Sequence, residues 1–208
     1  MSGKPQYDEA EVVGGALDAF WRHGYSATSI NVLTEATGLS RSSIYQRFGD
    51  KDGLFQIALA AYTERVMRRM TSSEGATARE RLESLLRGLL PSAPSSASGA
   101  ASAAQRPPGC LIARSCAELV DLPPESQKAV LADVTLQREA LLTLLKEGVT
   151  QGELPADADV DALGWYFLGV FQAILNLPQA GAGLADLDRT VSVAMSAWPE
   201  RSRTGKKR

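Results

Sequence analysis

Histidine and cysteine are scarce in this 208-residue sequence, which contains one His and two Cys. Because His23 stands alone, neither a histidine-based metal cluster nor a Ser/His/Asp triad is expected. The two cysteines, and a polar N-terminal stretch (MSGKPQYDEAE) unlike a signal peptide, predict a cytoplasmic protein without disulfides. The sequence also lacks paired-carboxylate and glycine-rich phosphate-binding patterns. We therefore expect no enzymatic activity, no cofactor and no metal site.

Long hydrophobic runs and an excess of basic charge are missing as well. The longest apolar stretch, residues 162–177, is short for a membrane span and contains Gln172 and Asn176, which predicts a buried helix and no membrane contact. The formal net charge is -2, but residues 41–51 contain three basic residues against Asp50 alone. Any contact with nucleic acid is therefore expected to be confined to a small patch.

Helical periodicity dominates the sequence and strand-like alternation is absent, so the predicted fold class is all-α. Residues 91–108, almost wholly Pro, Ser and Ala, are predicted to form a flexible loop. Within the expected helix at 50–70, the predicted inward residues are Leu54, Ile57, Ala58 and Ala61. The other expected helices cover about residues 8–24, 28–38, 40–48, 77–90, 109–122, 124–152, 158–177 and 184–197.

The segment TGLSRSSIYQRFGDKDGLF, residues 37–55, has the spacing of a helix-turn-helix. Gly38 can adopt the positive φ that ends the first helix, and Leu39 can fill the turn. Ile44 and Phe48, four residues apart, anchor the second helix and leave its other face free. That face carries groups that donate to phosphates and base edges. They belong to Arg41, Ser42, Ser43, Tyr45, Gln46 and Arg47.

Residues 16–62, from ALDAFWRHGY to FQIALAAY, resemble the N-terminal DNA-binding domain of TetR/AcrR-type transcriptional regulators. The resemblance implies that Tyr45 contacts the DNA backbone and that Lys51, which opens the fourth helix, contacts a phosphate. It places contacts with base edges at the start of the second helix of the motif, with two further contacts one turn later. These are Arg41, Ser42 and Ser43, followed by Gln46 and Arg47.

The same resemblance implies further contacts and a general architecture. Thr28 and Ser29 resemble the family's phosphate contacts at a helix N-terminus. Only Lys4 is available as a basic arm for the minor groove, so we expect operator binding to depend less steeply on salt than in relatives with a basic arm. The resemblance also implies a homodimer on a pseudo-palindromic, double-stranded DNA operator.

Two interpretations of the cysteines stay open. The segment GCLIARSCAEL, residues 109–119, resembles a segment of a TetR subgroup, some of whose members sense electrophiles or oxidants through a cysteine. Cys110, near a helix N-terminus, is then a reactive thiol. Alternatively, Cys110 and Cys116 are small core residues. Their six-residue spacing, about 9 Å along a helix, excludes a disulfide within an intact helix and a CxxC-type site.

The stretch GWYFLGVFQAILNL, residues 164–177, is aromatic on more than one face. A helix buried all round needs two neighbours, and with the helix at 184–197 this one resembles the family's dimer interface. Gly164 and Gly169 would permit close approach there. Alternatively, the aromatic side chains line a ligand cavity. They are those of Trp165, Phe167 and Phe171.

Together these patterns predict an N-terminal three-helix helix-turn-helix domain at 1–56, a C-terminal helical ligand-binding and dimerisation bundle at 57–200, and a basic tail at 201–208. The predicted function is a cytoplasmic transcriptional regulator, a repressor released from its operator by a small apolar ligand or by cysteine modification. The alternative is a ligand-independent α-helical dimer that binds DNA or a partner. An enclosed cavity in the bundle would argue against that alternative.

Overall fold

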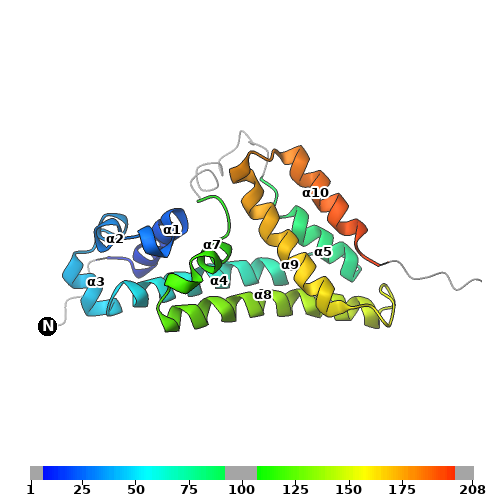
Figure 1. The fold of residues 1–208 in the computed structure, drawn as a ribbon, viewed down its shortest axis with the longest axis horizontal. Coiled ribbons are helices and arrows are strands. Elements are labelled where there is room, and N and C mark those ends of the chain that lie inside the picture. Colours follow the sequence, from blue (N-terminus) through cyan, green and yellow to red (C-terminus); the bar gives the residue numbers. More distant parts are fainter. Residues whose placement is uncertain (1–6, 92–106, 200–208) are drawn as a thin grey trace, which may run out of the picture. The chain divides into compact units, whose positions relative to one another are not determined.

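The structure is a computed structural model that describes residues 7–91 and 107–199. Within these ranges the chain forms nine α-helices, two short 3-10 helices and no strand, which confirms the prediction of an all-α fold (Figure 1). Lys4 and the tail at 201–208 lie outside the described residues, as does nearly all of the loop expected at 91–108.

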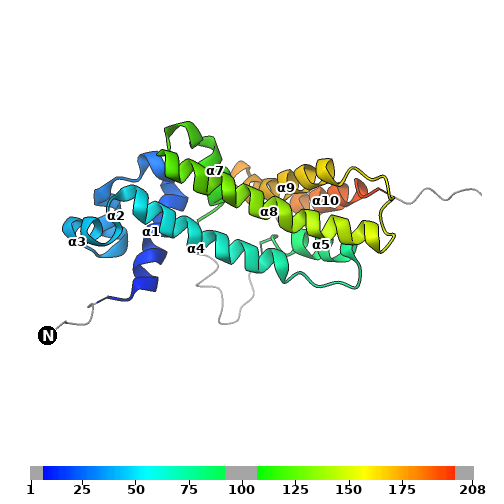
Figure 2. The same ribbon diagram turned by 90° about the horizontal axis from the view of Figure 1, so that it is seen from below.

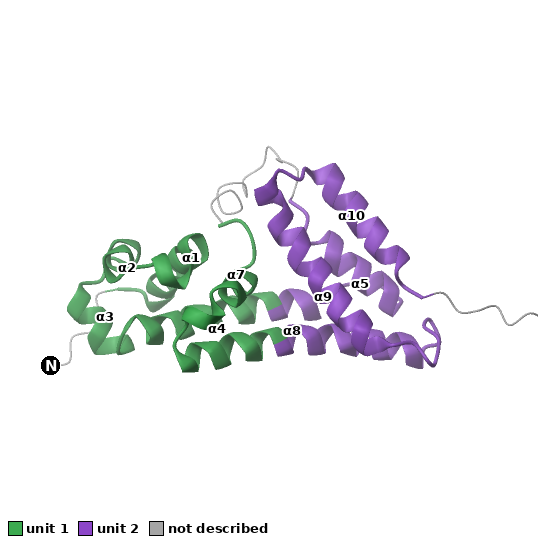
Figure 3. Ribbon diagram, in the orientation of Figure 1, with its two compact units in different colours: residues 1–66, 94–134 green, residues 67–93, 135–208 purple. Residues whose placement is uncertain are grey.

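Packing divides the chain into two compact units (Figure 3). Unit 1 comprises residues 1–66 and 94–134, and unit 2 comprises residues 67–93 and 135–208. The helices α4 (Lys51–Thr71) and α8 (Pro124–Thr150) therefore contribute residues to both units. The domain boundary expected between residues 56 and 57 stays a prediction.

The first helices of unit 1 begin and end where local side chains and glycines dictate. Asp8, Ser29 and Ser40 each accept a hydrogen bond from a backbone N–H two or three residues further on, so each is an N-cap. Gly38 and Gly49 have φ angles of 69° and 80°, a conformation that ends a helix and favours glycine. The helices group around the first turns of α4 (Figures 1 and 2). They are α1 (Glu9–Ala27), α2 (Ile30–Thr37) and α3 (Arg41–Phe48).

Aromatic and aliphatic side chains form the core between these helices. Phe20 of α1, Leu33 of α2 and Ile44 of α3 are fully buried. Phe55 of α4 meets Phe20 edge-on, with the ring centroids 5.1 Å apart. Burying each of these side chains contributes about 1.5–3 kcal/mol, so the cluster holds all three helices against α4.

The buried face of α4 differs from the expectation. The side chain of Ile57 was predicted to point inward, but it is 40% exposed. Leu54 and Ala58 are buried as predicted, and Phe55 and Leu59 are buried beside them. Because α4 carries apolar residues on more than one face, periodicity alone does not identify which of them is buried.

The rest of unit 1 contains α7 (Leu111–Ala117), η1 (Leu119–Asp121) and the first turns of α8. The single helix expected at 109–122 is therefore interrupted, and the interruption falls at Glu118, whose φ of -100° and ψ of 10° are not helical. Helix α7 packs against α1. Polar contacts also join α4 to α8 within this unit, because the hydroxyl of Thr63 donates to Asp133 over 2.7 Å.

Unit 2 is a bundle in which α10 contacts both α5 and α9. A Cβ at Gly164 would lie 2.9 Å from Cδ2 of Leu142, so this glycine lets α9 approach α8 of the same chain. Gly169 has no such neighbour within 4 Å. Close approach at Gly164 is thus used within the chain. The further helices of the unit are α5 (Ala78–Arg87), α9 (Val160–Asn176), η2 (Leu177–Ala180) and α10 (Leu184–Ser196).

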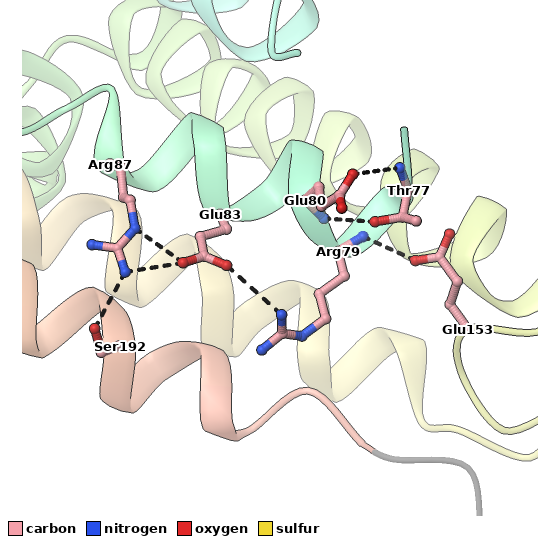
Figure 4. A network of polar contacts seen from close by, with 7 residues as sticks. All are labelled: Thr77, Arg79, Glu80, Glu83, Arg87, Glu153 and Ser192. Carbon is pink, nitrogen blue, oxygen red and sulfur yellow. Dashed lines mark hydrogen bonds and ion pairs between the residues drawn. The ribbon is translucent and has the colours of Figure 1, made fainter. Parts of the chain in front are cut away.

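A polar network surrounds α5 (Figure 4). Thr77 and Glu80 form a capping box at its start, and the carboxylate of Glu153, in the turn after α8, accepts the N–H groups of Ala78 and Arg79 at 3.0 Å each. At the other end of the helix, Arg87 pairs with Glu83 and also donates to Ser192 of α10. The network ties α5 to the turn after α8 and to α10.

Helix α9 together with η2, Val160–Ala180, is long and apolar enough to cross a membrane by length and composition. It is thus longer than the stretch at 162–177 suggested. Phe167 and Phe171 are buried inside unit 2, but only 28% of the most apolar window of this helix is buried, so the helix is not buried all round as predicted. A single helix of this kind is weak evidence for a membrane span.

Candidate nucleic-acid interface

The helices α2 and α3 form the helix-turn-helix. Helix α2 ends at Gly38 in the left-handed conformation, and Leu39 fills the turn with only 7% of its surface exposed. Ser40 then starts α3 by accepting the N–H of Ser43 at 3.2 Å. With Ile44 fully buried beneath it, α3 is fixed along one side and presents the other side to solvent.

The exposed side of α3 carries most of the predicted recognition residues. Arg41, Ser42, Gln46 and Arg47 are exposed, and the side chain of Tyr45 is 46% exposed. These donors and acceptors stand on a helix whose other side is held by the core. The geometry suits insertion into a major groove, where base edges present complementary donors and acceptors.

Two of these residues have partners that the sequence patterns did not reveal. Nη2 of Arg41 donates to Oδ1 of Asn31 in α2 over 2.9 Å, which orients the guanidinium at the start of α3. The guanidinium of Arg47 lies 4.2 Å from the ring centroid of Tyr7, just before α1. In hindsight, only the proximity of α2 and α3 could have pointed to Asn31, and no signal pointed to Tyr7.

The hydroxyls at the start of α3 form a small cluster. Oγ of Ser40 lies 2.9 Å from Oγ of both Ser42 and Ser43. Ser42 is exposed, whereas Ser43 is half-buried. Ser42 is therefore better placed than Ser43 to contact a base edge directly.

Thr28 and Ser29 do not form the pair of phosphate contacts that the sequence predicted. Ser29 is exposed and caps α2. Thr28 is fully buried, and its hydroxyl donates to the carbonyl oxygen of Gly24 over 2.5 Å. The interpretation of Thr28 as a surface contact is corrected here, because its side chain stabilises the end of α1 instead.

Lys51 lies at the first position of α4, as expected, but it is not a freely solvated lysine. Its ammonium nitrogen lies 4.1 Å from the ring centroid of Tyr25. Burial lowers the pKa of Lys51, and the carboxylate of Glu118 acts in the opposite direction. Burial, followed by the charges of Asp52 and Asp50, raises the pKa of Tyr25 to about 12, so Tyr25 is neutral at physiological pH.

The acidic residues next to Lys51 are occupied by contacts of their own. Oδ1 of Asp50 accepts the N–H of Gly53 at 2.9 Å and so caps α4. Asp52 accepts hydrogen bonds from Gln56 and from the hydroxyl of Ser126. These contacts hold both carboxylates at the start of α4, where they complement the helix dipole.

The two cysteines occupy different environments in unit 1. Cys110 is 2% exposed and interacts with the hydroxyl of Tyr62, whose pKa is raised by burial and then by Cys110. Cys116 is half-buried, and burial, followed by the effect of Cys110, raises the pKa of its thiol. A raised pKa leaves less thiolate at neutral pH, so the environment of Cys116 is not that of an activated thiol.

The three aromatic residues predicted to interact with a ligand do not share one site. Phe167 and Phe171 are buried, whereas Trp165 is 57% exposed. The ring centroid of Trp165 lies 4.8 Å from the guanidinium carbon of Arg138. Two open grooves formed by described residues of unit 2, of about 620 and 520 Å³, are not lined by these aromatic residues. Within the described ranges, no group of three His, Cys, Asp or Glu residues could hold a metal ion.

The fold and the exposed face of α3 define an all-α regulator with a helix-turn-helix head. Comparison with known proteins identifies its family. Residues 12–58 match the model described as "Bacterial regulatory proteins, tetR family", and residues 93–192 match "Tetracyclin repressor-like, C-terminal domain". The chain belongs to the TetR family.

Several relatives support this assignment. The HTH-type transcriptional repressor ComR of Escherichia coli (strain K12) is 26% identical over 199 residues, which covers 95% of this chain and 92% of ComR. AcnR of Corynebacterium glutamicum is 38% identical over 87 residues, 42% of this chain and 43% of that repressor. A cysteine mutant of the TetR family regulator CifR, solved with 26-bp operator DNA, has a TM-score of 0.77 at 27% identity and covers 95% of this chain and 100% of that chain. The present chain is a DNA-binding transcriptional regulator and not an enzyme.

Proposed function

We propose that the chain is a cytoplasmic, homodimeric repressor that binds a pseudo-palindromic operator through α3 and is released by a small apolar effector. The exposed polar face of α3 above the buried Ile44 carries this proposal. The names of the curated relatives, several of which are HTH-type transcriptional repressors, favour repression over activation.

In this proposal the residues of the interface divide into three groups. Arg41 and Ser42 contact base edges, because they stand at the exposed start of α3. Tyr45, Ser29 and Lys51 contact the phosphate backbone and set the position of α3 on the duplex. Ser43, Gln46 and Arg47 contribute secondary contacts at the same face.

The outward faces of α9 and α10 support a homodimer. Tyr166 is 42% exposed and Val193 is 67% exposed, and both line the groove of about 520 Å³ together with Val170. Trp165, the residue before Tyr166 in α9, is also exposed. A second copy that covers these side chains would remove them from water. Two heads would then occupy half-sites about 34–36 Å, or a multiple of that distance, apart.

The environments of the two cysteines argue against cysteine modification as the trigger, which leaves a small ligand as the proposed one. Cys110 is almost completely buried, and the raised pKa of Cys116 reduces its thiolate fraction at neutral pH. In the ligand mechanism, an effector that binds one packing of the bundle more tightly shifts the population toward it. Operator affinity then falls by the differential affinity of the effector for the two states.

Genomic selection of bound DNA fragments, with and without a thiol oxidant, tests the whole proposal. We expect one family of pseudo-palindromic fragments under both conditions, and release by an apolar compound in a subsequent screen. Failure to enrich any duplex would refute DNA recognition by α3. Loss of binding only with the oxidant, and only while Cys110 or Cys116 is present, would replace the ligand with thiol chemistry. Binding that no compound alters would favour the ligand-independent alternative.

The dimer is tested separately by light scattering at several protein concentrations. Val193→Asp places a charge in the exposed apolar face and is expected to give a monomer with an intact helical spectrum. Asp157→Asn, a change at an exposed residue outside this face, should leave the mass unchanged. A dimer that survives Val193→Asp would place the interface elsewhere.

A further inference from the structure

Two polar contacts join α7 to α1 within unit 1. The indole N–H of Trp21 donates to the carbonyl oxygen of Gly109 over 3.1 Å in a buried contact. One helical turn later, the backbone N–H of Tyr25 donates to Oε2 of Glu118 over 2.7 Å. The acceptors flank α7, since one precedes its first residue and the other follows its last. Helix α1 therefore holds α7 at both ends.

The contact with Glu118 depends on the backbone conformation of Gly24. This residue has a φ of 80° and a ψ of 174° inside α1, a conformation that strongly favours glycine. The kink leaves the next N–H, that of Tyr25, directed at the carboxylate. A Cβ at Gly24 would lie 2.3 Å from Oε1 of Glu118, so a side chain there would displace the carboxylate as well as strain φ.

The side chain of Tyr25 extends the contact to the DNA-binding surface. Its ring packs on Phe55, with the centroids 5.1 Å apart, and on Phe20 at 6.2 Å. The ammonium nitrogen of Lys51 lies 4.1 Å from the centroid of the same ring. Contacts thus run without interruption from Glu118, at the end of α7, through Tyr25 to Lys51, at the start of α4.

We propose that Glu118 is a positioning residue for operator binding, which acts through Tyr25 to hold Lys51 ready for its phosphate contact. The inference rests on the phosphate contact proposed above for Lys51. A lysine side chain has many rotamers, and fixing it in advance lowers the entropy lost on binding. Glu118 lies in the second family-matched region, at 93–192, whereas Lys51 lies in the first, at 12–58.

Substitutions at Glu118 separate its hydrogen bond from its charge. Glu118→Ala removes the acceptor of the Tyr25 N–H, whereas Glu118→Gln keeps an acceptor oxygen and removes the charge. Asp121→Ala, which removes an exposed carboxylate three residues further on, is the matched control. All variants are first compared by thermal melting, so that operator binding is measured well below the melting temperature of each.

Operator affinity is then measured by fluorescence anisotropy over a series of salt concentrations. Glu118→Ala is expected to weaken binding about fivefold while it leaves the salt slope unchanged, because the lysine cation remains and only the entropy lost in placing it increases. Lys51→Ala removes the cation and should lower the slope by about one. Added to Lys51→Ala, Glu118→Ala should have little further effect, since both changes act on the same contact. Glu118→Gln and Asp121→Ala should stay within about twofold of the unsubstituted protein. Additive losses of Glu118→Ala and Lys51→Ala would overturn the proposal, because they would show that Glu118 acts independently of Lys51.

A second measurement on the DNA-free protein separates this inference from the proposed function. The ring of Tyr25 should shift the side-chain NMR signals of Lys51 upfield. We expect that shift to disappear in Glu118→Ala and to persist in Glu118→Gln. If Lys51→Ala leaves the salt slope unchanged, the phosphate contact of Lys51 is wrong, yet the NMR shift still decides whether Glu118 positions Lys51. An unchanged shift in Glu118→Ala refutes the positioning role.

Discussion

The carboxylate of Glu153 is expected to make a large contribution to the stability of unit 2. It accepts the N–H groups of Ala78 and Arg79, the first two residues of α5, at 3.0 Å each. No intrahelical acceptor exists for such N–H groups. A hydrogen bond to a charged group contributes about 1.5–3 kcal/mol, and partial exposure places both bonds at the low end of that range. Allowing for water that replaces part of the loss, we expect Glu153→Ala to cost about 2 kcal/mol.

This cost is measurable as a change in the midpoint of thermal unfolding. For a chain of this size, 1 kcal/mol corresponds to about 2–4 °C, so Glu153→Ala should lower the midpoint by roughly 4–8 °C. Protein concentration must be fixed, because dimerisation also shifts the midpoint. Glu153→Gln keeps one acceptor oxygen and should lose about half as much.

Glu139→Ala is the control, since this exposed residue of α8 should change stability by at most about 0.5 kcal/mol. If Glu153→Ala has the same melting midpoint as Glu139→Ala, water satisfies the N–H groups at the start of α5 as well as the carboxylate does. The attribution of stability to the Glu153 carboxylate is then refuted. A loss in Glu153→Gln as large as in Glu153→Ala would instead show that the charge, and not the acceptor geometry, is decisive.

Three further predictions concern the operator, pH and a buried amide. Arg41→Ala should cost about 1–3 kcal/mol of binding free energy and relax specificity at one base pair, whereas Lys51→Ala should weaken binding to all sequences alike. Binding to a panel of operator variants measures both effects. Equal, sequence-independent losses would contradict the role of Arg41. Burial raises the pKa of Asp133, so the folded state binds its proton more tightly than the unfolded state, and stability falls as pH rises toward the folded pKa. Asp133→Asn should therefore raise stability near neutral pH and flatten the pH profile in urea unfolding, while Asp157→Asn should not. Gln137 is fully buried and neither polar atom of its amide has a partner among the described residues, so Gln137→Met should raise the melting midpoint; a lower midpoint would reveal a partner for the amide.

The helix-turn-helix could be predicted from the sequence because its determinants are local. Ser40 and Gly38 act through neighbours within four residues, and both take the conformations that the pattern indicated. Ile44 is buried as its spacing predicted. A cap, a left-handed glycine and an apolar anchor each depend on a few adjacent residues, so one sequence contains all the information needed.

Predictions that concerned a surface rather than a helix were less successful. Thr28 and Ser29 are adjacent and chemically alike, yet Ser29 caps α2 at the surface whereas Thr28 bonds inward to Gly24. The aromatic residues of α9 divide similarly, with Phe167 inside and Trp165 outside. In both cases the two residues are of similar chemical type, so residue type does not distinguish the buried one from the exposed one. Which of them faces solvent is decided by helices that pack from elsewhere in the chain.

Gly24 shows this limit most clearly. The pattern treated it as the stop of the first helix, whereas α1 continues to Ala27 beyond a kink at this residue. The glycine fits because its φ is positive and because the carboxylate of Glu118 occupies the place of a Cβ. The hydrogen bond that results joins residues 93 positions apart. No local pattern contains such a partner, and for that reason the contact between α7 and the DNA-binding head became visible only in the folded chain.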